Sequence, residues 1–377
     1  MEHGSEASRA GEKIVLKNCK LVITKDERER ILRNVDILIS EGRIETIGEV
    51  KEKADMVIDS SNYLVMPSLV DSHMHLPSKR YQDLSSLEHN ISFRLKALIS
   101  HGVTSMVVYS NDVEPILAAA SQIGLRIRPA IKISQLRECQ AKLTNLPLPP
   151  IISIEDSEEC IENLPEIKEF VEKGMSVHIH IAESRQEVFA FKKRFHKTPI
   201  SLLFERGILS KNTCLINPNW IASWELNLVK GCDSVIIWSP STSMYKAMNG
   251  FFPYRELKEM NVQIAIGSCD SNVLLNSNPL KELKLASLLV RYNYWDSSLF
   301  LPLDHVTTIG ERIMGVKVGR IKVGYLADLV LLDINRLLLK GLDMNKVEED
   351  LIYLMDSGDV IKVISNGRIV FSRIRDA

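Results

Sequence analysis

The sequence predicts an α/β protein, a (β/α)8 TIM-like barrel accompanied by a small β domain. Through the middle of the 377 residues, short apolar runs alternate with amphipathic segments, and eight such runs can be counted. This alternation is typical of parallel strands joined by helices, and eight repeats close most economically into a barrel. Both ends of the chain consist instead of short strand patterns separated by turns. Functional residues are therefore expected at the carboxyl ends of the central strands.

The composition is that of a globular protein, with 45% hydrophobic and 25% charged residues. Because 47 basic residues face 48 acidic ones, giving a net charge of -1, neither nucleic acid nor a membrane surface is expected as a partner. No apolar stretch approaches the roughly 20 residues that cross a bilayer, and the polar first residues lack a signal-peptide core. The six cysteines are scattered without a CxxC spacing, which favours reduced thiols. We therefore expect a cytoplasmic protein.

The strand patterns at the two ends are short and alternate apolar with polar residues. They occupy residues 13–23, 35–40, 43–48, 319–333 and 359–374. Turn signals separate them, namely Glu41-Gly42 and the pair Asn366-Gly367, which strongly favours a two-residue hairpin. The N-terminal hairpins alone have thin apolar faces, so they need further strands, and the C-terminal stretches can supply them.

Between the two ends, strand and helix patterns follow one another along the chain. The expected strands lie within residues 69–75, 101–110, 125–133, 151–156, 176–184, 213–217, 234–240 and 262–271. The expected helices include residues 84–100, 113–123, 158–174 and 186–195. Right-handed crossovers between successive parallel strands would place all the strand carboxyl ends on one face.

Two histidine pairs lie at the ends of predicted strands. His73 and His75 end the first strand in MPSLVDSHMHLP, and His178 and His180 end the fifth in SVHIHIAES, where Glu183 follows directly. Because side chains alternate along a strand, the members of a pair share a face and can hold one metal ion together. One such pair is weak evidence, since many histidines are simply hydrogen-bonded. Two pairs at strand ends indicate a metal site.

These motifs resemble the amidohydrolase superfamily, in the branch of nucleobase deaminases, adenosylhomocysteine deaminases and triazine chlorohydrolases. PSLVDSHMH is similar to that family's PGLVDxHxH, and HIHIAE to its HxHxxE. GRIKVGYLADLVLLD and the hairpin after it are similar to the family's GxIxxGxxADLVxxD and closing hairpin. The resemblance implies a composite β-sandwich domain of residues 1–65 and 320–377, built from both chain ends, beside a metal-dependent barrel hydrolase domain of residues 66–319.

The resemblance also implies one divalent metal ion, zinc or alternatively iron, bound by His73, His75, His180 and an aspartate ending strand eight. We choose Asp270 as this aspartate. Such a metal lowers the pKa of its water from about 15.7 to near 7 and so yields hydroxide at neutral pH. Glu183 would carry a proton to the ring nitrogen of the substrate, while Asp270 would take the proton of the attacking water.

Two of these residues also have a structural interpretation. His178 shares a face with His180, but the family often has a histidine there that is not a ligand, so we expect a structural role. Glu183 could instead be a charge that stabilises the first turn of a helix. Its spacing from His180 favours the catalytic role.

Strands six and seven depart from the family pattern. Asn217 replaces the histidine of strand six, and it can orient hydroxide or a carbonyl by hydrogen bonding but cannot carry charge. In strand seven, Trp238 replaces a histidine and Ser243 an asparagine. We assign Asn217 to the catalytic residues and Trp238 to the substrate contacts.

Strand eight reads Gly267-Ser268-Cys269-Asp270 where the family has GTD. A strict register puts Cys269 where the aspartate belongs, because a slip of one residue reverses the facing of every side chain. We assume a bulge or an offset at Gly267 that restores Asp270, since barrel rims commonly contain such irregularities. Cys269 as a thiolate ligand is the alternative.

The segment after His75 is shorter than the family's loop that closes over the substrate ring. It retains Lys79, Arg80 and Tyr81, which could contact an anionic or aromatic substrate. Charged residues at a rim are also commonly just solvated. We name Arg80 as the candidate substrate contact.

The sequence thus predicts a metal-dependent hydrolase of non-peptide C–N bonds, an aminohydrolase (deaminase) that uses a metal-activated hydroxide on a nucleobase-like heterocycle. An amidase or a chlorohydrolase on the same scaffold would use the same hydroxide. A catalytically degenerate binding protein is a further alternative, favoured by Asn217 but opposed by the intact histidines and Glu183. A Rossmann-type protein is excluded because no GxGxxG follows a strand. The expected partner is a small-molecule substrate, and related enzymes suggest a homodimer.

Overall fold

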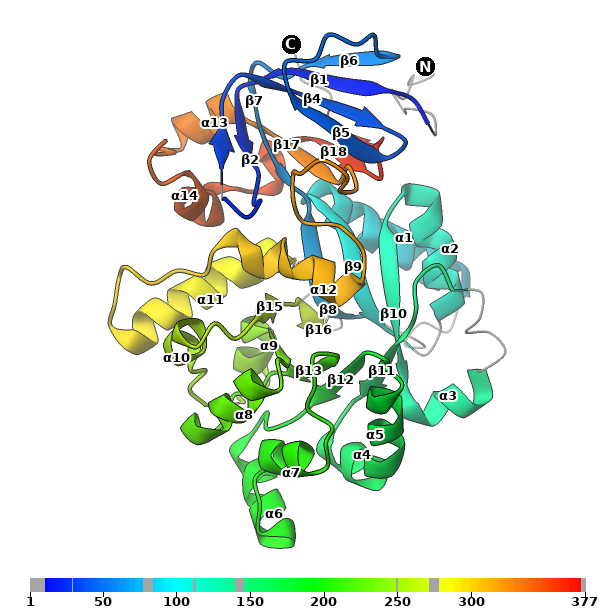
Figure 1. Ribbon diagram of the computed structural model, residues 1–377, viewed down its shortest axis with the longest axis vertical. Coiled ribbons are helices and arrows are strands. Elements are labelled where there is room, and N and C mark those ends of the chain that lie inside the picture. Colours follow the sequence, from blue (N-terminus) through cyan, green and yellow to red (C-terminus); the bar gives the residue numbers. More distant parts are fainter. Residues whose placement is uncertain are drawn as a thin grey trace.

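The computed structural model describes residues 11–28, 30–76, 84–110, 113–139, 146–248, 250–270 and 278–373, and of residues 84–90, 137–139 and 270 it describes the backbone alone. Its centre is a nearly closed parallel barrel, as the strand count predicted (Figure 1). The barrel strands share one sheet in the order β15-β14-β13-β12-β11-β10-β9-β8-β16. Their bounds are β8 Leu69–His75, β9 Val103–Tyr109, β10 Arg126–Lys132, β11 Ile151–Ile154, β12 Val177–His180, β13 Thr213–Ile216, β14 Val235–Trp238, β15 Ile264–Ile266 and β16 Cys269–Asp270.

Helices surround the barrel and connect its strands (Figure 1). They are α1 Leu84–Ser100, α2 Val113–Ile123, α3 Ile133–Cys139, α4 Ser157–Glu162, α5 Leu164–Glu172, α6 Arg185–Phe195, α7 Pro199–Glu205, α8 Leu226–Gly231, α9 Pro240–Tyr245, α10 Tyr254–Glu259, α11 Pro279–Tyr294 and α12 Ile309–Met314. α1 and α2 coincide with the expected helices. Within the described residues, no helix combines the length and the apolar character that a membrane crossing requires.

The single helix expected over residues 158–174 is wrong, because α4 and α5 divide it at Asn163. Pro165 lies in the first turn of α5, where its missing N–H is tolerated. In one continuous helix, the proline ring would clash with the preceding turn and remove a backbone hydrogen bond. Asn163 therefore ends α4 and begins α5.

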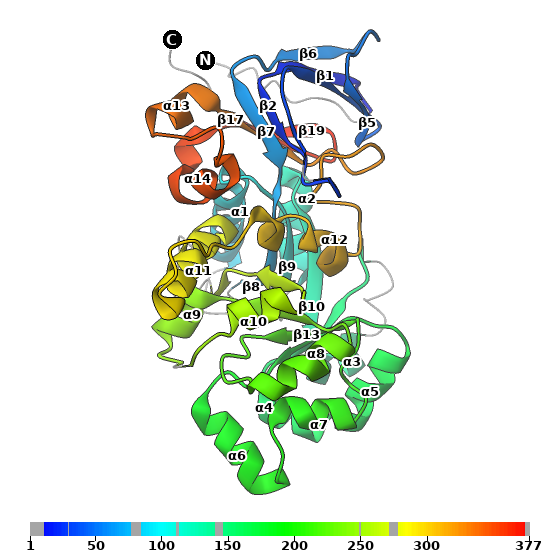
Figure 2. The same cartoon turned by 60° about the vertical axis from the view of Figure 1, so that its left-hand side comes forward.

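The two chain ends build two mixed sheets beside the barrel (Figure 2). One sheet has the order β5-β4-β1-β6 and the other β19-β18-β17-β7-β2-β3. The strands are β1 Ile14–Cys19, β2 Leu21–Ile23, β3 Ile31–Leu32, β4 Val35–Ser40, β5 Arg43–Gly48, β6 Met56–Asp59, β7 Tyr63–Pro67, β17 Leu329–Asp333, β18 Val360–Ser365 and β19 Arg368–Ser372. The helices α13 Ile334–Leu339 and α14 Val347–Leu354 lie between β17 and β18. The expected fold class is confirmed, whereas the boundaries near residues 65 and 320 stay a prediction.

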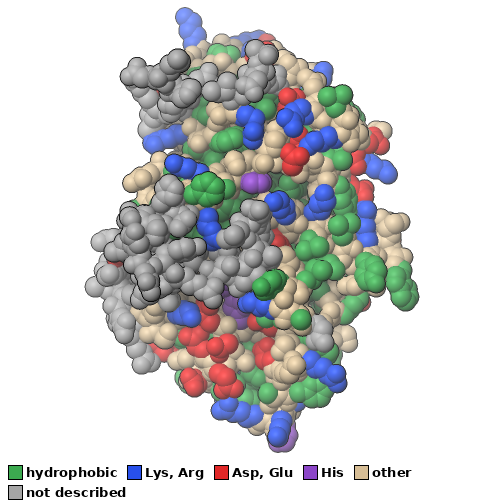
Figure 3. Space-filling model, turned by 180° about the vertical axis from the view of Figure 1, so that it is seen from behind, with side chains coloured by type: hydrophobic (Ala, Val, Ile, Leu, Met, Phe, Trp, Pro, Cys, Tyr) green, Lys and Arg blue, Asp and Glu red, His purple; other side chains and the backbone are tan. Residues whose placement is uncertain are grey.

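The two sheets share an apolar core to which both chain ends contribute, including Leu16 and Ile39 from the N-terminal part and Leu331 and Ile364 from the C-terminal part. The predicted hairpin between β18 and β19 turns at Asn366 and Gly367, with φ of 49° and 74°. Positive φ at both positions is what a type I′ turn requires. On the face drawn in Figure 3, Lys and Arg side chains are interspersed with Asp and Glu, in keeping with a net charge of -1.

A buried ion pair joins the sandwich to the barrel. Asp328, which is 1% exposed, pairs with Arg126 of β10 and also accepts a hydrogen bond from the backbone N–H of Asn366 at 2.6 Å. Nearby, the N–H of Ser68 donates to the carbonyl of Asp328 at 3.0 Å, where β7 passes into β8. The buried carboxylate of Asp328, which has lost most of its hydration, therefore holds the sandwich and the barrel together.

The barrel closes through a strand that is broken in two. β15 pairs with β14, whereas β16 pairs with β8, and Gly267 and Ser268 lie between the two pieces. A Cβ at Gly267 would lie 2.6 Å from Cβ of His73, so only glycine allows this approach. Asp71 of β8 accepts hydrogen bonds from the backbone N–H of Ser268, at 3.0 Å, and from its hydroxyl. Burial raises the pKa of Asp71 to about 7.

We predict that Arg126→Ala lowers the free energy of unfolding by about 3–5 kcal/mol, because it leaves the Asp328 carboxylate buried without its cation. Urea denaturation followed by circular dichroism measures this. As a control, Glu169→Ala breaks a pair with Lys173 in which both side chains are more than half exposed, and it should change stability by about 0.5 kcal/mol or less. Equal small effects of both substitutions would contradict the structural role of the junction.

We predict that Asp71 makes stability fall as the pH rises. Between the unfolded pKa of about 3.9 and the folded pKa of about 7, the folded protein keeps a proton that the unfolded chain has lost. The free energy of unfolding of the metal-free protein therefore decreases across this window, by at most about 1.4 kcal/mol per pH unit relative to Asp71→Asn. Urea denaturation at several pH values tests this, with Asp55→Asn at an exposed position as the control. If the difference in free energy of unfolding between the wild type and Asp71→Asn did not change with pH, the prediction would be wrong.

Candidate metal centre

Three histidine rings converge at the carboxyl end of the barrel. His73 and His75 come from β8 and His180 from β12. The ring centroid of His73 lies 4.8 Å from that of His75 and 4.9 Å from that of His180, and His75 and His180 are 5.8 Å apart. The structure thus brings together the three histidines that the sequence predicted as ligands.

The innermost ring, that of His73, is fully buried, and neither of its nitrogens has a hydrogen-bond partner among the residues that the structure describes. Burial, reinforced by the neighbouring His75 and His180, lowers its pKa well below the ordinary value. A neutral imidazole is the form that binds metal ions. Nε2 of His180 is likewise buried and unpartnered. Because orphaned buried polar atoms are rare, these nitrogens suit an ion between the rings.

His180 is oriented by Glu183. Its Nδ1 lies 2.9 Å from Oε1 of Glu183, so Nε2 is turned towards the other histidines. Burial lowers the pKa of His180, but the Glu183 carboxylate outweighs burial and raises it. Conversely, burial raises the pKa of Glu183, and the neighbouring His180 overcomes this and holds it below its ordinary value. Glu183 is therefore ionised at neutral pH, and a carboxylate behind a ligating histidine fixes its tautomer.

The loop that carries Glu183 is held by the start of α6. Glu187 accepts hydrogen bonds from the backbone N–H groups of Ala182, at 2.7 Å, and Glu183, at 2.8 Å. Ser184 caps α6 by accepting from the N–H of Glu187 at 3.3 Å. Ala182 has a positive φ of 55°, which turns the chain at the strand end. Glu183 therefore lies before the helix and outside its first turn.

Asn217 directly follows β13 and faces Glu183. Its Oδ1 accepts from the backbone N–H of Ser239 at 2.8 Å, so its Nδ2 points the other way and donates to Oε1 of Glu183 at 3.3 Å. Both hydrogen bonds to the Glu183 side chain that the structure describes use Oε1. The asparagine that replaces the family histidine thus positions the carboxylate. Its predicted contact with hydroxide or carbonyl stays a prediction.

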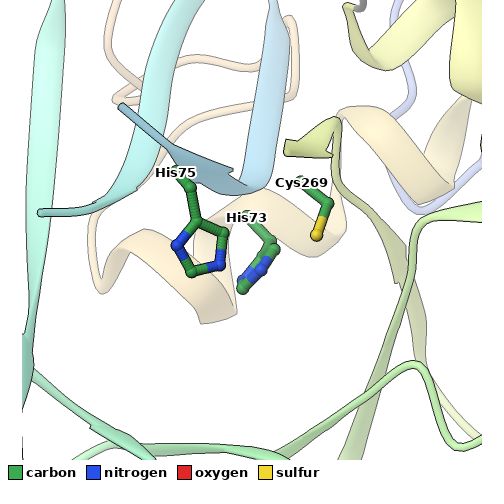
Figure 4. A group of neighbouring side chains, drawn as sticks. All are labelled: His73, His75 and Cys269. Carbon is green, nitrogen blue, oxygen red and sulfur yellow. The ribbon is translucent and has the colours of Figure 1, made fainter. Parts of the chain in front are cut away.

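Strand eight brings a sulfur atom to the histidines. The ligand atoms of His73, His75 and Cys269 all lie within 4.8 Å of one another (Figure 4). Cys269 has a left-handed backbone with φ of 52°, and its neighbour Asp270 pairs with His75 through the backbone. The strand is interrupted at Gly267 and Ser268, between β15 and β16, and the described side chain that reaches the histidines is that of Cys269. Whether Asp270 is a ligand stays a prediction.

Two further polar residues, which belong to no motif in the sequence, lie at neighbouring strand ends. Glu155 follows β11, with Oε2 3.9 Å from Nδ1 of His75 and 3.9 Å from Nζ of Lys132. Burial raises the pKa of Glu155, but the nearby histidines outweigh this and lower it. Tyr109 ends β9, packs its ring 4.0 Å from His73 and hydrogen-bonds Nδ1 of His178. A polar residue directly after each apolar strand run was the available signal.

The remaining candidates have different surroundings. His178 is 1% exposed and hydrogen-bonded to the hydroxyl of Tyr109, as is typical of a structural histidine. Trp238 is 3% exposed and stacks on Phe252 at a centroid distance of 4.1 Å. Its assignment to the substrate stays a prediction. Arg80 lies outside the described residues. Ser243, which replaces the family asparagine, accepts a hydrogen bond from Nδ2 of Asn219 at 3.1 Å.

The donor set fits a zinc ion. Two imidazoles and a sulfur lie close together, and a third imidazole has an Nε2 with no partner among the described residues. Nitrogen and sulfur are donors that zinc prefers. The fit rests on the orphaned nitrogens of His73 and His180, which have no partner among the described residues.

Comparison with known proteins places the chain in a family. The model of the amidohydrolase family matches residues 64–370. The 5-methylthioadenosine/S-adenosylhomocysteine deaminase of Pyrococcus furiosus is 27% identical over 404 residues, which cover 95% of this chain and 94% of that protein. The 5'-deoxyadenosine deaminase of Methanosarcina barkeri is 26% identical over 405 residues, covering 95% and 92%.

Among solved structures, the fold is similar to that of an adenosine deaminase from Xanthomonas campestris with bound zinc. The TM-score is 0.80 at 19% sequence identity, over 94% of this chain and 92% of that chain. Because the family match spans more than half of the sequence, the protein belongs to the amidohydrolase family, as the motifs around His73 and His180 predicted.

Proposed function

We propose that this protein is a zinc-dependent aminohydrolase that removes the amino group of an adenine-type nucleoside. The observation that carries the proposal is the set of three converging histidines, with a buried neutral His73 and with Glu183 behind His180. The relatives in the family are named for deaminating 5-methylthioadenosine, S-adenosylhomocysteine and 5'-deoxyadenosine, which share a purine with an exocyclic amino group. The scattered cysteines favour reduced thiols, which supports a cytoplasmic location.

In the proposed reaction, a C–O bond forms at the ring carbon that carries the amino group, the C–N bond breaks, and ammonia leaves. A divalent ion held by His73, His75 and His180 would supply the Lewis acidity that lowers the pKa of water from about 15.7 to near 7. Glu183 is ionised and buried beside the histidines, so it can take a proton from the attacking water and pass it to the ring nitrogen or the leaving amine.

Two contacts keep Glu183 in place for this transfer. Its Oε1 is held by Nδ1 of His180 and Nδ2 of Asn217, which leaves Oε2 for the proton as far as the described residues are concerned. Because Asn217 is neutral, it stabilises the ionised carboxylate by a hydrogen bond without competing for the proton. The family's charged residue at strand six is thus replaced by a positioning amide.

We predict that purified protein contains about one zinc ion per chain and releases ammonia from adenine-type nucleosides. Plasma mass spectrometry measures the metal, and a coupled ammonia assay compares adenosine, 5'-deoxyadenosine, 5'-methylthioadenosine and S-adenosylhomocysteine. His180→Ala should lose the metal, because one of three imidazole donors disappears. His101→Ala, at a histidine in the turn before the amino end of β9, is the control and should keep it. Protein that binds no metal even after reloading would overturn the proposal.

We predict that Glu183→Gln lowers kcat by roughly 10²–10⁴-fold while the zinc content is unchanged. Glutamine can still accept the hydrogen bond from His180, so the ligand stays oriented, but it cannot take a proton. Steady-state kinetics and metal analysis of the same preparation measure the two effects, with Glu158→Gln on the exposed face of α4 as the control. Loss of zinc together with activity would show that Glu183 only orients His180.

A further inference from the structure

We propose that Sγ of Cys269 is a ligand of the metal ion, so that a thiolate takes the place of the strand-eight aspartate. This inference rests on the proposed function, because it concerns the same ion. Cys269 is 1% exposed, and its sulfur lies with the ring nitrogens of His73 and His75 in one group of donor atoms no more than 4.8 Å apart (Figure 4).

The backbone of strand eight is bent to bring the sulfur there. Cys269 pairs with Met74, which packs into the apolar layer outside the barrel interior. In a regular parallel pair, directly opposed side chains lie on the same face, so a regular Cys269 would follow Met74 away from the histidines. Cys269 instead has φ of 52°, a conformation that costs a non-glycine residue of order 1 kcal/mol or more. This local turn places the sulfur beside the histidines instead.

The chemistry of the group selects a soft metal ion. Zinc binds thiolate at about 2.3 Å and imidazole at about 2.0–2.1 Å, so donors on one tetrahedral zinc lie about 3.5 Å apart. The donor atoms in the structure lie within 4.8 Å of one another, so they differ from that spacing by about 1 Å. Thiolate favours zinc over harder ions such as magnesium and manganese.

Other buried cysteines of the chain lie outside the group of metal-donor atoms and can be compared with Cys269. Cys19, Cys160 and Cys214 are buried, and burial raises the pKa of each to about 12. Such cysteines behave as small apolar side chains. Among the described residues, the group of metal-donor atoms contains Cys269 and none of these three. Cys214, in β13 of the same barrel, is therefore a matched control.

A thiolate ligand also changes which residues can transfer protons. An aspartate at this position could bind metal and accept the proton of the attacking water, whereas a metal-bound sulfur is a poor proton shuttle. Other zinc deaminases combine histidine and cysteine ligands with a single glutamate that serves as both acid and base. With Cys269 as ligand, Glu183 is left to fill that combined role, and Asp270 is not required for metal binding.

Cobalt substitution tests the proposal, because a thiolate bound to Co²⁺ gives an intense near-ultraviolet charge-transfer band that nitrogen and oxygen ligands do not give. Metal-free protein is titrated with Co²⁺ and followed by absorption. We expect one equivalent to produce the band in the wild type, in Cys214→Ser and in Asp270→Asn. We expect Cys269→Asp to bind Co²⁺ without the band, because the carboxylate replaces the sulfur.

A second measurement uses the unmodified protein and so does not depend on the folding of a variant. Zinc should protect Cys269 from alkylation by iodoacetamide by at least about tenfold in rate, read from the modified peptide by mass spectrometry. Stoichiometric cobalt binding by the wild type without the band, or a band that survives in Cys269→Asp, would overturn the thiolate ligand while leaving the proposed function standing. Wild type that binds neither zinc nor cobalt would overturn both.

Discussion

The site depends on how the barrel is closed between its first and last strands. Asp71 holds Ser268 from β8, and Gly267 leaves room for the backbone of His73 to approach. Two of the three strands that supply donor atoms, β8 with its histidines and β16 with its sulfur, are placed by this one seam. Burial raises the pKa of the Asp71 carboxyl to about 7, and burying such a polar group costs free energy. Its hydrogen bonds to Ser268 join the first strand to the last and so offset this cost.

Opposite the seam, the second half of the site is a hydrogen-bonded chain rather than a set of independent residues. Ser239 fixes the amide of Asn217, Asn217 and His180 fix Glu183, and Glu183 in turn aims His180. The sequence departures at strands six and seven thus form one consistent arrangement. The backbone N–H of Ser239 fixes the Asn217 amide, and this amide in turn donates to the Glu183 carboxylate.

Features that follow from local periodicity were predictable from the sequence. Alternation along β8 and β12 placed His73, His75 and His180 on inward faces, and Asn366-Gly367 specified its hairpin. Features that arise from packing between distant segments were not. The left-handed Cys269 follows from the break in strand eight, and the direction of the Asn217 amide follows from Ser239. Glu155 belongs to no motif and becomes a neighbour of His75 only once β11 is in place. The division of α4 from α5 was visible in Pro165 but was outweighed by amphipathic spacing.

The antiparallel pairing of β7 with β17 has a consequence for how the chain folds. Met66 lies opposite Val330, so the strand that leads directly into His73 finds its partner only when the last part of the polypeptide has emerged from the ribosome. Contacts this distant in sequence form slowly, because the intervening loop must first be closed. Until then, one edge of β7 lacks its final partner and can pair with other chains. We therefore expect the newly made protein to depend on chaperones at the stage when β17 is still missing.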